Sequence, residues 1–277
     1  MIDYDRIRDF YDQHRKQQTT CDPDFLRGTV EVSTGIARFR NRAEARHLER
    51  VLKVEGGQRV LDLGAGTGRW SIFFAERGAR VTSVELAPSL AESARANAAE
   101  RGLEIDCRVG TILDPPLLPT ERFDMVHIGG VLVYIDDADL EQVRTVVRAH
   151  SKPGSLLVLR EPVDPRGPSQ QQEQNYAAIF RRPERYRELF SGDFRLLYER
   201  TTVSHLVPRG RSTHSVVAGM RKPSWRTPLV EHVLPLVGHV DYHLLQLEEA
   251  LRASPLRMLL GDPGVVQHFY IFARNYR

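Results

Sequence analysis

VLDLGAGTGRW, which spans Val60–Trp70, is the stretch that decides the fold of this chain. It is an apolar run that ends in an acid and continues into three glycines within five residues. Glycines at the end of a strand allow a ligand to lie against bare backbone amides at the start of the following helix. The stretch therefore predicts a ligand-binding turn between a buried strand and a helix.

Two common nucleotide-binding motifs do not fit these glycines. A triphosphate-binding loop requires Lys followed by Ser or Thr after the last glycine, and no such pair follows here. The dinucleotide fingerprint requires a third Gly or Ala, where this chain has Arg69 or Ser71, depending on the register. The pattern that remains is D-x-G-x-G-x-G, formed by Asp62, Gly64, Gly66 and Gly68.

Two acids at the ends of successive strands indicate which chemical groups the ligand carries. Asp62 suits a positively charged group, such as the ammonium of an amino acid, and the glycine-rich helix start suits its carboxylate. Glu85 ends the next strand, where an acid can accept hydrogen bonds from both hydroxyls of a ribose. An ammonium, a carboxylate and a ribose together describe S-adenosylmethionine.

At this point the chain resembles the class I S-adenosylmethionine-dependent methyltransferase family, in the branch that acts on small molecules of secondary metabolism. The matching segments, in family order within residues 40–163, are VLDLGAGTGRW, VTSVELAPS, VGTILD, FDMVHIGGVLVYIDD and KPGSLLVLREP. The resemblance implies that the glycine turn holds the methionine part of the cofactor and that the residues after the third strand flank the adenine. The cofactor-binding residues that it implies are Asp62, Gly64, Ala65, Gly66, Gly68, Glu85, Leu86, Thr111, Ile112 and Gly129.

Strand-like and helix-like segments alternate after residue 56. Strands are expected at residues 59–64, 80–86, 104–110, 123–130 and 155–163, and helices at 69–78, 88–102 and 137–154. Strands separated by helical patterns favour an α/β fold with a doubly wound, mostly parallel, Rossmann-like sheet. The family resemblance implies seven strands, of which the last is antiparallel.

The flanking segments are less regular. Helices are expected at residues 3–18, 41–54 and 230–254, a polar loop at 165–174, a helix interrupted at Pro183 over 175–190, and late strands at 194–203 and 265–275. We expect one compact unit with three parts. These are an N-terminal helical cap (1–55), the cofactor-binding core (56–163), and a C-terminal part (164–277) whose helical insertion also caps the active site.

The composition of the 277-residue chain is that of an ordinary soluble protein. A formal net charge of +3 gives no strong field toward nucleic acid or membrane. The N-terminus lacks the apolar stretch of a signal peptide, and the apolar runs are shorter than the ~20 residues that a spanning helix needs. Cys21 and Cys107 form no metal-type pair, and two free thiols are favoured over a disulfide. We therefore expect a cytoplasmic protein without a metal site, and a homodimer is one option for its assembly.

Four residues are candidates for a catalytic role toward the methyl acceptor: Glu161, Tyr134, Tyr11 and His14. Methyl transfer from a sulfonium is an in-line displacement, so catalysis is mainly positioning, and a base is needed only where the acceptor must lose a proton. The glutamate is a candidate base or a clamp for a cationic acceptor, with a salt bridge to Arg160 or Arg181 as the alternative. The tyrosine after the fourth strand is a candidate for lining the site. The two residues on the N-terminal helix are candidates for a lid, with ordinary packing as the alternative.

The resemblance implies a methyltransferase that acts on O, N or C of a small organic acceptor and releases S-adenosylhomocysteine. One alternative is methylation of RNA or protein, because residues 200–230 contain six Arg or Lys and no acid. That stretch, however, lacks an RNA-binding motif with interleaved aromatic residues. A second alternative is a protein that binds the cofactor but uses the site for other chemistry, such as cyclisation.

Overall fold

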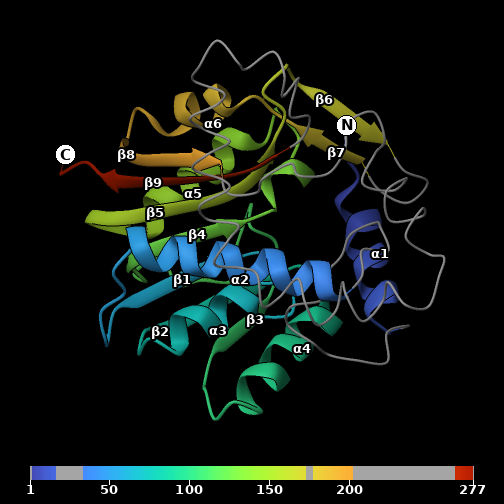
Figure 1. The fold of residues 1–277 in the computed structure, drawn as a ribbon, viewed down its shortest axis with the longest axis vertical. Helices are drawn as coiled ribbons and strands as arrows, with labels where there is room; N and C mark the ends of the chain where they lie inside the picture. Colours follow the sequence, from blue (N-terminus) through green and yellow to red (C-terminus); the bar gives the residue numbers. More distant parts are fainter. Residues whose placement is uncertain (1, 17–33, 173–176, 202–265, 277) are drawn as a thin grey trace. The chain divides into compact units, whose positions relative to one another are not determined.

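A seven-stranded sheet forms the centre of the structure (Figure 1). The computed structural model describes residues 2–16, 34–172, 177–201 and 266–276. The strands lie in the order β3-β2-β1-β4-β5-β9-β8, and the first five pair in parallel while β9 is antiparallel to β5. Their bounds are β1 Arg59–Leu63, β2 Arg80–Glu85, β3 Asp106–Val109, β4 Phe123–Gly129, β5 Ser151–Val163, β8 Phe194–Thr201 and β9 Val266–Arg274. The doubly wound, mostly parallel sheet is thereby confirmed.

The strand order reverses between β1 and β4. These two strands run side by side in parallel, with Asp62 next to His127 and Leu63 next to Ile128. In open α/β sheets, ligands bind outside the carboxyl ends of the strands at such a reversal. The glycine turn follows β1 and Gly129 ends β4, so both lie at this position.

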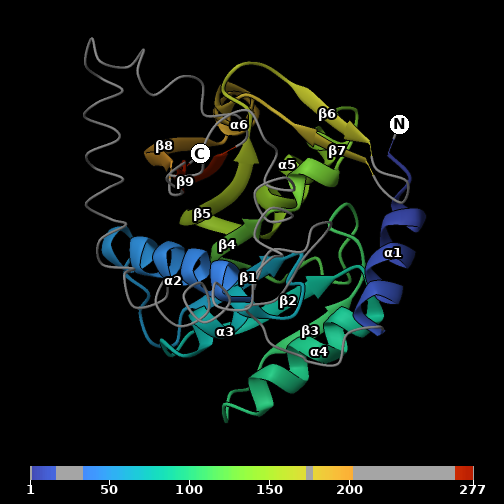
Figure 2. The ribbon, with the colours of Figure 1, turned by 45° about the vertical axis from the view of Figure 1, so that its right-hand side comes forward.

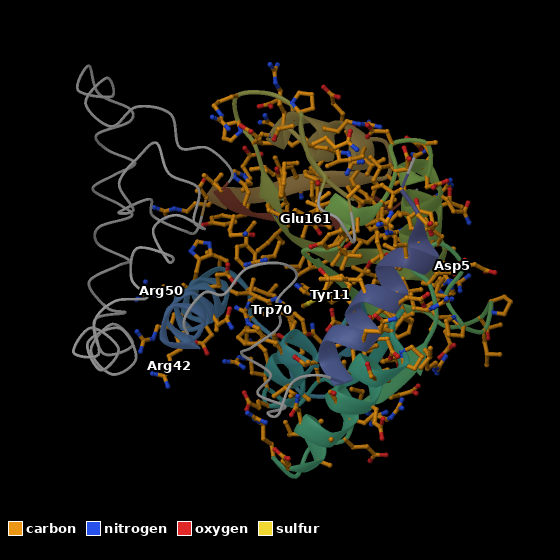
Figure 3. All side chains as sticks on the ribbon, turned by 90° about the vertical axis from the view of Figure 1, so that its right-hand side faces the viewer. Asp5, Tyr11, Arg42, Arg50, Trp70 and Glu161 are labelled. Atoms are coloured by element: carbon orange, nitrogen blue, oxygen red, sulfur yellow. The ribbon has the colours of Figure 1, made fainter. Side chains whose placement is uncertain are left out.

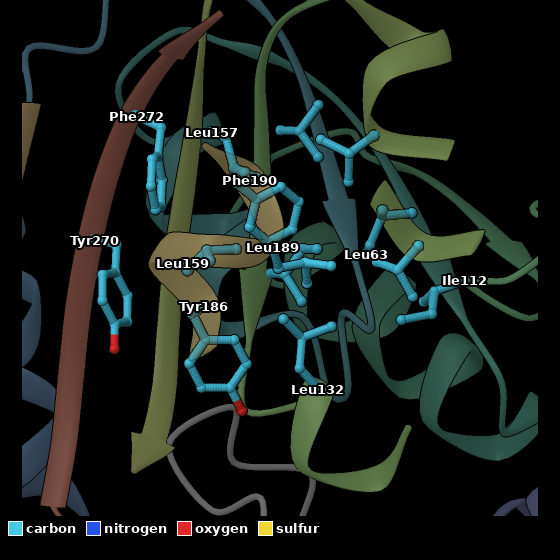
Figure 4. Packing of buried hydrophobic residues seen from close by; sticks show 14 of the residues in the cluster. Leu63, Ile112, Leu132, Leu157, Leu159, Tyr186, Leu189, Phe190, Tyr270 and Phe272 are labelled. Atoms are coloured by element: carbon cyan, nitrogen blue, oxygen red, sulfur yellow. The ribbon is translucent and has the colours of Figure 1, made fainter. Parts of the chain in front are cut away.

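Helices cover both faces of the sheet. Helices α3 (Arg69–Ala75) and α4 (Pro88–Ala99) follow β1 and β2 on one face, and α5 (Leu140–His150) and α6 (Pro183–Phe190) pack on the other. The sequence of α5 repeats apolar residues at spacings of three and four, which buries one side of the helix against the strands. Figure 4 shows the core of this second face, in which α6 packs on β5 and β9 through Tyr186, Leu189, Phe190, Leu157, Leu159, Tyr270 and Phe272.

Residues 165–180 differ from the prediction. The expected polar loop and the start of the expected helix instead form an antiparallel hairpin of β6 (Ser169–Gln172) and β7 (Ala177–Phe180). The helix begins only at Pro183. A strand of a two-stranded hairpin outside the main sheet buries little surface, so its sequence need not alternate apolar and polar residues. A smaller difference lies at residues 151–154, which were expected to end a helix and instead begin β5.

Contacts divide the chain into two units. The first comprises residues 1–23, 54–200 and 265–277, and contains helix α1 (Tyr4–Lys16) and all of the sheet except Thr201, the last residue of β8. The second comprises residues 24–53 and 201–264, of which the structure describes helix α2 (Thr34–Val51). The three expected parts, residues 1–55, 56–163 and 164–277, stay predictions from the sequence. The helix expected at 230–254 lies outside the described residues.

Within the first unit, α1 and the hairpin β6–β7 lie beside each other (Figures 1 and 2). Ile2 and Ile7 of the N-terminal segment pack in one buried cluster with Val133 after β4 and Ala178 of β7. Neither α1 nor any other helix in the described ranges has the length and apolar composition needed to cross a lipid bilayer.

Candidate functional site

The glycine stretch forms a tight turn between β1 and α3, as the sequence predicts. Gly64, Gly66 and Gly68 have φ angles of 82°, 58° and 89°, which residues with a side chain rarely adopt. The turn is also closely packed, since a Cβ on Gly64 would lie 2.2 Å from Cγ2 of Val131, and one on Gly68 would lie 3.1 Å from Ala94. The glycines therefore allow the segment after β4, and helix α4, to approach the turn.

Asp62, in β1 just before this turn, is 1% exposed. Its Oδ2 accepts a hydrogen bond from Oγ of Ser71 at 2.6 Å, and its Oδ1 accepts one from Nδ1 of His127 at 2.7 Å. Nε2 of His127 has no hydrogen-bond partner among the described residues. Asp62 thus joins β1 to the first turn of α3 and to β4, the strand on the other side of the reversal.

Glu85 is the second acid at the turn. Its carboxylate accepts hydrogen bonds from the N–H groups of Gly66 at 2.8 Å and of Ala87 at 2.9 Å. Burial raises the pKa of Glu85, and these N–H groups oppose that rise. Because each carboxylate oxygen has more than one acceptor position, Glu85 can also accept hydrogen bonds from the hydroxyls of a ligand.

The segment after β3 lies next to Glu85. Gly110 donates its backbone N–H to the carbonyl of Glu85 at 2.9 Å. Thr111 is half-buried and its hydroxyl accepts the N–H of Leu113 at 3.2 Å, while Ile112 is buried in the main core. The residues predicted to flank an adenine therefore stand at the carboxyl end of β3, beside the predicted ribose acid.

Three further predicted cofactor residues border the same turn. Ala65 is buried within it, and Leu86 is half-buried and packs in the apolar cluster that contains Ile2 and Ile7 of the N-terminal segment. Gly129 ends β4, where a Cβ would lie 2.7 Å from Cε1 of His127. These positions therefore belong to the same region as the two acids.

Glu161, at the end of β5, holds the segment after β4. Its Oε1 accepts the N–H groups of Val131 at 3.0 Å and of Leu132 at 3.2 Å, at the start of the short 3-10 helix η1 (Leu132–Tyr134). The side chain is completely buried, and burial raises the pKa of Glu161 to about 7. Its Oε2 has no hydrogen-bond partner in the part of the chain that the structure describes. A buried carboxyl group with one unused oxygen therefore lies beside the glycine turn.

Arg181 holds both ends of η1. Its guanidinium donates to three acceptors: the carbonyls of Leu132 (2.6 Å) and Ile135 (2.6 Å) and the carboxylate of Asp137 (2.8 Å). The positive charges of Arg160 and Arg181 lower the pKa of Glu161 against the effect of burial. These hydrogen bonds of Arg181 thus go to the two ends of η1 and to Asp137, and its influence on Glu161 is electrostatic.

Helix α1 is fastened across the carboxyl ends of β2 and β4. The hydroxyl of Tyr4 donates to Asp139 at 2.5 Å and accepts the N–H of Asp136 at 3.1 Å. Asp12 accepts the N–H of Ser89, at the start of α4, at 2.9 Å. These hydrogen bonds connect α1 to the segments that follow two different strands, so they hold α1 in place at this edge of the sheet.

Tyr11 of α1 contacts Tyr134 of η1. The hydroxyl of Tyr11 donates to that of Tyr134 at 2.9 Å, and the two rings are in edge-to-face contact with centroids 5.9 Å apart. Figure 3 shows Tyr11 on the side of α1 toward Glu161, whereas Asp5 lies on the opposite side. Burial raises the pKa of Tyr134, and the charge of Glu161 raises it further. Three of the four acceptor-side candidates therefore lie in one region, and the side chain of the fourth, His14, lies outside the described residues.

Sequence reasoning missed the groups that hold these candidates in place. Ser71 entered only as a departure from the dinucleotide motif, and Asp12 and Tyr4 carried no signal beyond helical spacing. The sequence suggested Arg181 as a salt-bridge partner of Glu161 and did not predict its hydrogen bonds to the segment after β4. Their partners come from distant parts of the chain, so no local pattern indicates them.

Comparison with known families identifies the core. The family described as "Methyltransferase domain" matches residues 60–154, from the second residue of β1 to the first residues of β5. Residues 60–154 form a class I methyltransferase domain. Domains of this family bind S-adenosylmethionine, and the matched residues include the glycine turn and its two buried acids, Asp62 and Glu85.

Curated relatives that this chain matches are also methyltransferases. The ubiquinone biosynthesis O-methyltransferase of Xanthomonas axonopodis pv. citri (strain 306) is 36% identical over 106 residues, which are 37% of this chain and 42% of the relative. The chain thus spans less than half the length of the curated relatives that it matches.

Two solved structures are similar to nearly the whole chain. One is a magnesium protoporphyrin IX methyltransferase from Synechocystis PCC 6803 with bound S-adenosylmethionine, with a TM-score of 0.58 at 12% identity, covering 98% of this chain and 97% of that one. The other is a [4+2]-cyclase, with a TM-score of 0.59 at 15% identity, covering 99% and 95%. At these identities the likeness shows the shared fold alone.

Proposed function

We propose that this protein is an S-adenosylmethionine-dependent methyltransferase that transfers a methyl group to O, N or C of a small organic acceptor. The observation that carries the proposal is the meeting of three features at the carboxyl ends of the strands. These are the glycine turn, the buried acid Glu85 bonded to it, and a second buried acid, Glu161, with an unused oxygen. The glycine turn and Glu85 are suited to binding the cofactor. Glu161 is suited to accepting a proton from the acceptor.

For the cofactor, S-adenosylmethionine supplies an electrophilic methyl group on a sulfonium. Residues 64–68 offer backbone amides and close approach to its amino-acid part, Glu85 offers acceptors to the ribose, and Thr111 and Ile112 flank the adenine. Ala65, Leu86 and Gly129 border the same place. Since both oxygens of Asp62 are already hydrogen-bonded, we infer that it fixes the turn and places negative charge under the ammonium.

For the acceptor, Glu161 is the proposed general base. A base acts best when its pKa lies near the working pH, and burial brings the pKa of Glu161 to about 7. The hydroxyls of Tyr11 and Tyr134 orient the acceptor. Catalysis then rests mainly on holding the acceptor in line with the methyl group.

The two alternatives from the sequence remain alternatives. The fold alone does not separate methyl transfer from other chemistry, because one of the similar structures is a [4+2]-cyclase. The basic stretch 200–230, which favoured RNA, lies almost entirely outside the described residues.

The test is transfer of label from methyl-labelled S-adenosylmethionine to a library of phenols, amines and nucleosides, with RNA and a protein mixture as parallel acceptors. The proposal expects label in a small molecule. Label confined to RNA or protein would overturn the acceptor class, and cofactor binding without any transfer would favour the cyclase-like alternative. The variant Glu161→Gln should bind the cofactor as the wild type does and lose transfer, because glutamine keeps the N–H contacts and cannot accept the proton.

The homodimer and the cytoplasmic location stay predictions from the sequence. Size-exclusion chromatography with light scattering decides the first.

A further inference from the structure

His127 of β4 is a buried histidine to which the proposed function gives no role of its own. Strand pairing places it beside Asp62 of β1, and both side chains are 1% exposed. Nδ1 of His127 lies 2.7 Å from Oδ1 of Asp62, while the hydroxyl of Ser71 donates to Oδ2 at 2.6 Å. Since a carboxylate oxygen can only accept, Nδ1 carries the proton of this hydrogen bond. The carboxylate is therefore held by one donor from β4 and one from α3.

The rest of the imidazole ring has apolar surroundings. Its centroid lies 5.3 Å from that of the Trp70 ring and 5.5 Å from that of Phe74. A Cβ on Gly129 would lie 3.2 Å from Nε2, and Nε2 has no hydrogen-bond partner in the described part of the chain. A buried polar atom without a partner is unfavourable, so packing alone would favour an apolar side chain here. The bond from Nδ1 to Asp62 is therefore what explains a histidine at this position.

Two negative charges lie at the glycine turn without a basic side chain bonded to either. Asp62 and Glu85 are both buried, and the charge of Asp62 acts on Glu85 by raising its pKa. Within the described ranges, neither acid forms an ion pair with a lysine or an arginine. An imidazole can donate from Nδ1 without carrying a positive charge, whereas a lysine or an arginine would cancel the charge of the carboxylate. His127 thus fixes Asp62 and leaves its negative charge in place.

We propose that His127 is a positioning residue of the cofactor site, which holds the carboxylate of Asp62 so that its charge acts on the ammonium group of the cofactor. This inference rests on the proposed binding of S-adenosylmethionine at the glycine turn. Without the Nδ1–H group, Oδ1 of Asp62 is a buried acceptor that has lost its donor, and the carboxylate turns or takes up a proton. Either change weakens the attraction for the ammonium group. The ribose and the adenine depend on Glu85 and on the segment after β3, so their contacts remain.

Two variants of the same shape separate this hydrogen bond from the packing of the ring. His127→Asn places an amide N–H as many bonds from the backbone as Nδ1, whereas His127→Leu places a methyl group there, and both remove the ring. Binding of S-adenosylhomocysteine is measured by calorimetry. We expect His127→Leu to weaken it about tenfold or more, as the loss of a hydrogen bond to a charged group does, and His127→Asn to stay within about threefold of the wild type.

A second probe locates the effect within the cofactor. The nucleoside 5′-methylthioadenosine keeps the adenine, the ribose and a thioether, and it lacks the ammonium and carboxylate groups. Its contacts are independent of Asp62, so neither variant should change its affinity by more than about twofold. A residue with a merely structural role would affect both probes alike.

The other hydrogen bond to Asp62 offers a parallel test with a matched control. Ser71→Ala removes the donor to Oδ2 and should weaken S-adenosylhomocysteine binding about threefold or more. Ser83→Ala is the control and should leave this affinity unchanged. Ser83 is as buried as Ser71 and pairs with Asp62 in the sheet, but no hydrogen bond joins the two side chains among the described residues. Thermal melting confirms that each variant is folded.

The outcomes separate this inference from the proposed function. Equal losses of S-adenosylhomocysteine affinity in His127→Asn and His127→Leu would assign the effect to the ring and overturn the role of Nδ1. An equal loss for both probes in His127→Leu would also overturn it, because the whole site would then be disturbed. In either case binding by the wild type leaves the cofactor proposal standing. A wild-type protein that binds neither probe overturns the proposed function and this inference together.

Discussion

Replacing Gly64 with alanine tests how tightly the segment after β4 packs on the glycine turn. Gly64 has a φ of +82°, a left-handed conformation that costs a residue with a side chain about 1 kcal/mol. The new Cβ would also lie 2.2 Å from Cγ2, 3.2 Å from Cγ1 and 3.3 Å from Cβ of Val131. The severe overlap is with a side-chain methyl group, so the valine must rotate or its backbone must shift, and the bond from its N–H to Glu161 opposes the shift.

The magnitude follows from these two contributions. Overpacking of a closely packed position costs about 1–3 kcal/mol, so Gly64→Ala should lower the free energy of unfolding by about 2–4 kcal/mol in total. Gly57 offers a matched control, since its φ is also +82° and a Cβ there would have no atom within 4 Å. Gly57→Ala should therefore lower the free energy of unfolding by only about 1 kcal/mol.

The assay is urea unfolding followed by circular dichroism for Gly64→Ala, Gly57→Ala, Val131→Ala and the double variant Gly64→Ala/Val131→Ala. The double variant should be less destabilised than the sum of its single changes, by about 1–3 kcal/mol, because the overlap is relieved. Calorimetry should show weaker cofactor binding for Gly64→Ala and unchanged binding for Gly57→Ala. Equal losses of stability for the two alanine variants, or additive effects in the double variant, would refute the proposed contact.

Three further predictions follow from single contacts. Methyl transfer should rise as pH increases through about 7, where Glu161 ionises, and Glu161→Gln should abolish this rise in a pH–rate profile; a rise that persists assigns the ionisation to another group. Glu85→Ala should weaken cofactor binding by about 1–3 kcal/mol in calorimetry, because acceptors for the ribose and for the turn are lost, whereas the exposed Glu92→Ala should leave it unchanged. Arg181→Met should lower the free energy of unfolding by about 3 kcal/mol or more, since two buried hydrogen bonds and a partly buried one are lost, and the exposed Arg182→Met by less than about 0.5 kcal/mol. Equal melting temperatures for the two arginine variants would contradict that role.

The core of the fold could be predicted because its signals are local. An apolar run followed by glycines indicates β1 and its turn, and Pro88 at the first position of α4 indicates where that helix begins. The two acids were identified for the same reason, since each stands at the end of an apolar strand. The hairpin β6–β7 had no such signal, because its polar strand pairs outside the main sheet.

The contacts that assemble the acceptor side could not be predicted. Tyr11 and Tyr134 are 123 residues apart, and Asp12 and Ser89 are 77 apart. Helical spacing indicates that α1 has a packed face, but it does not indicate which strand ends that face contacts. A lid over the cofactor and an ordinary packed helix have the same sequence pattern. The hydrogen bonds of Tyr4 and Asp12 favour a helix that is held in place over one that opens and closes.

The burial of Glu161 is better explained by proton transfer than by stability. Its pKa is about 7 in the folded protein against 4.5 for the exposed group. Between these values the folded state holds a proton that the unfolded state has lost, so the free energy of unfolding falls as pH rises from about 4.5 to 7. The total loss is about 3 kcal/mol at neutral pH and above. A glutamine would accept the N–H groups of Val131 and Leu132 without this loss. An acid at this position therefore weakens the fold at neutral pH, which agrees with the proposed role of Glu161 as the base.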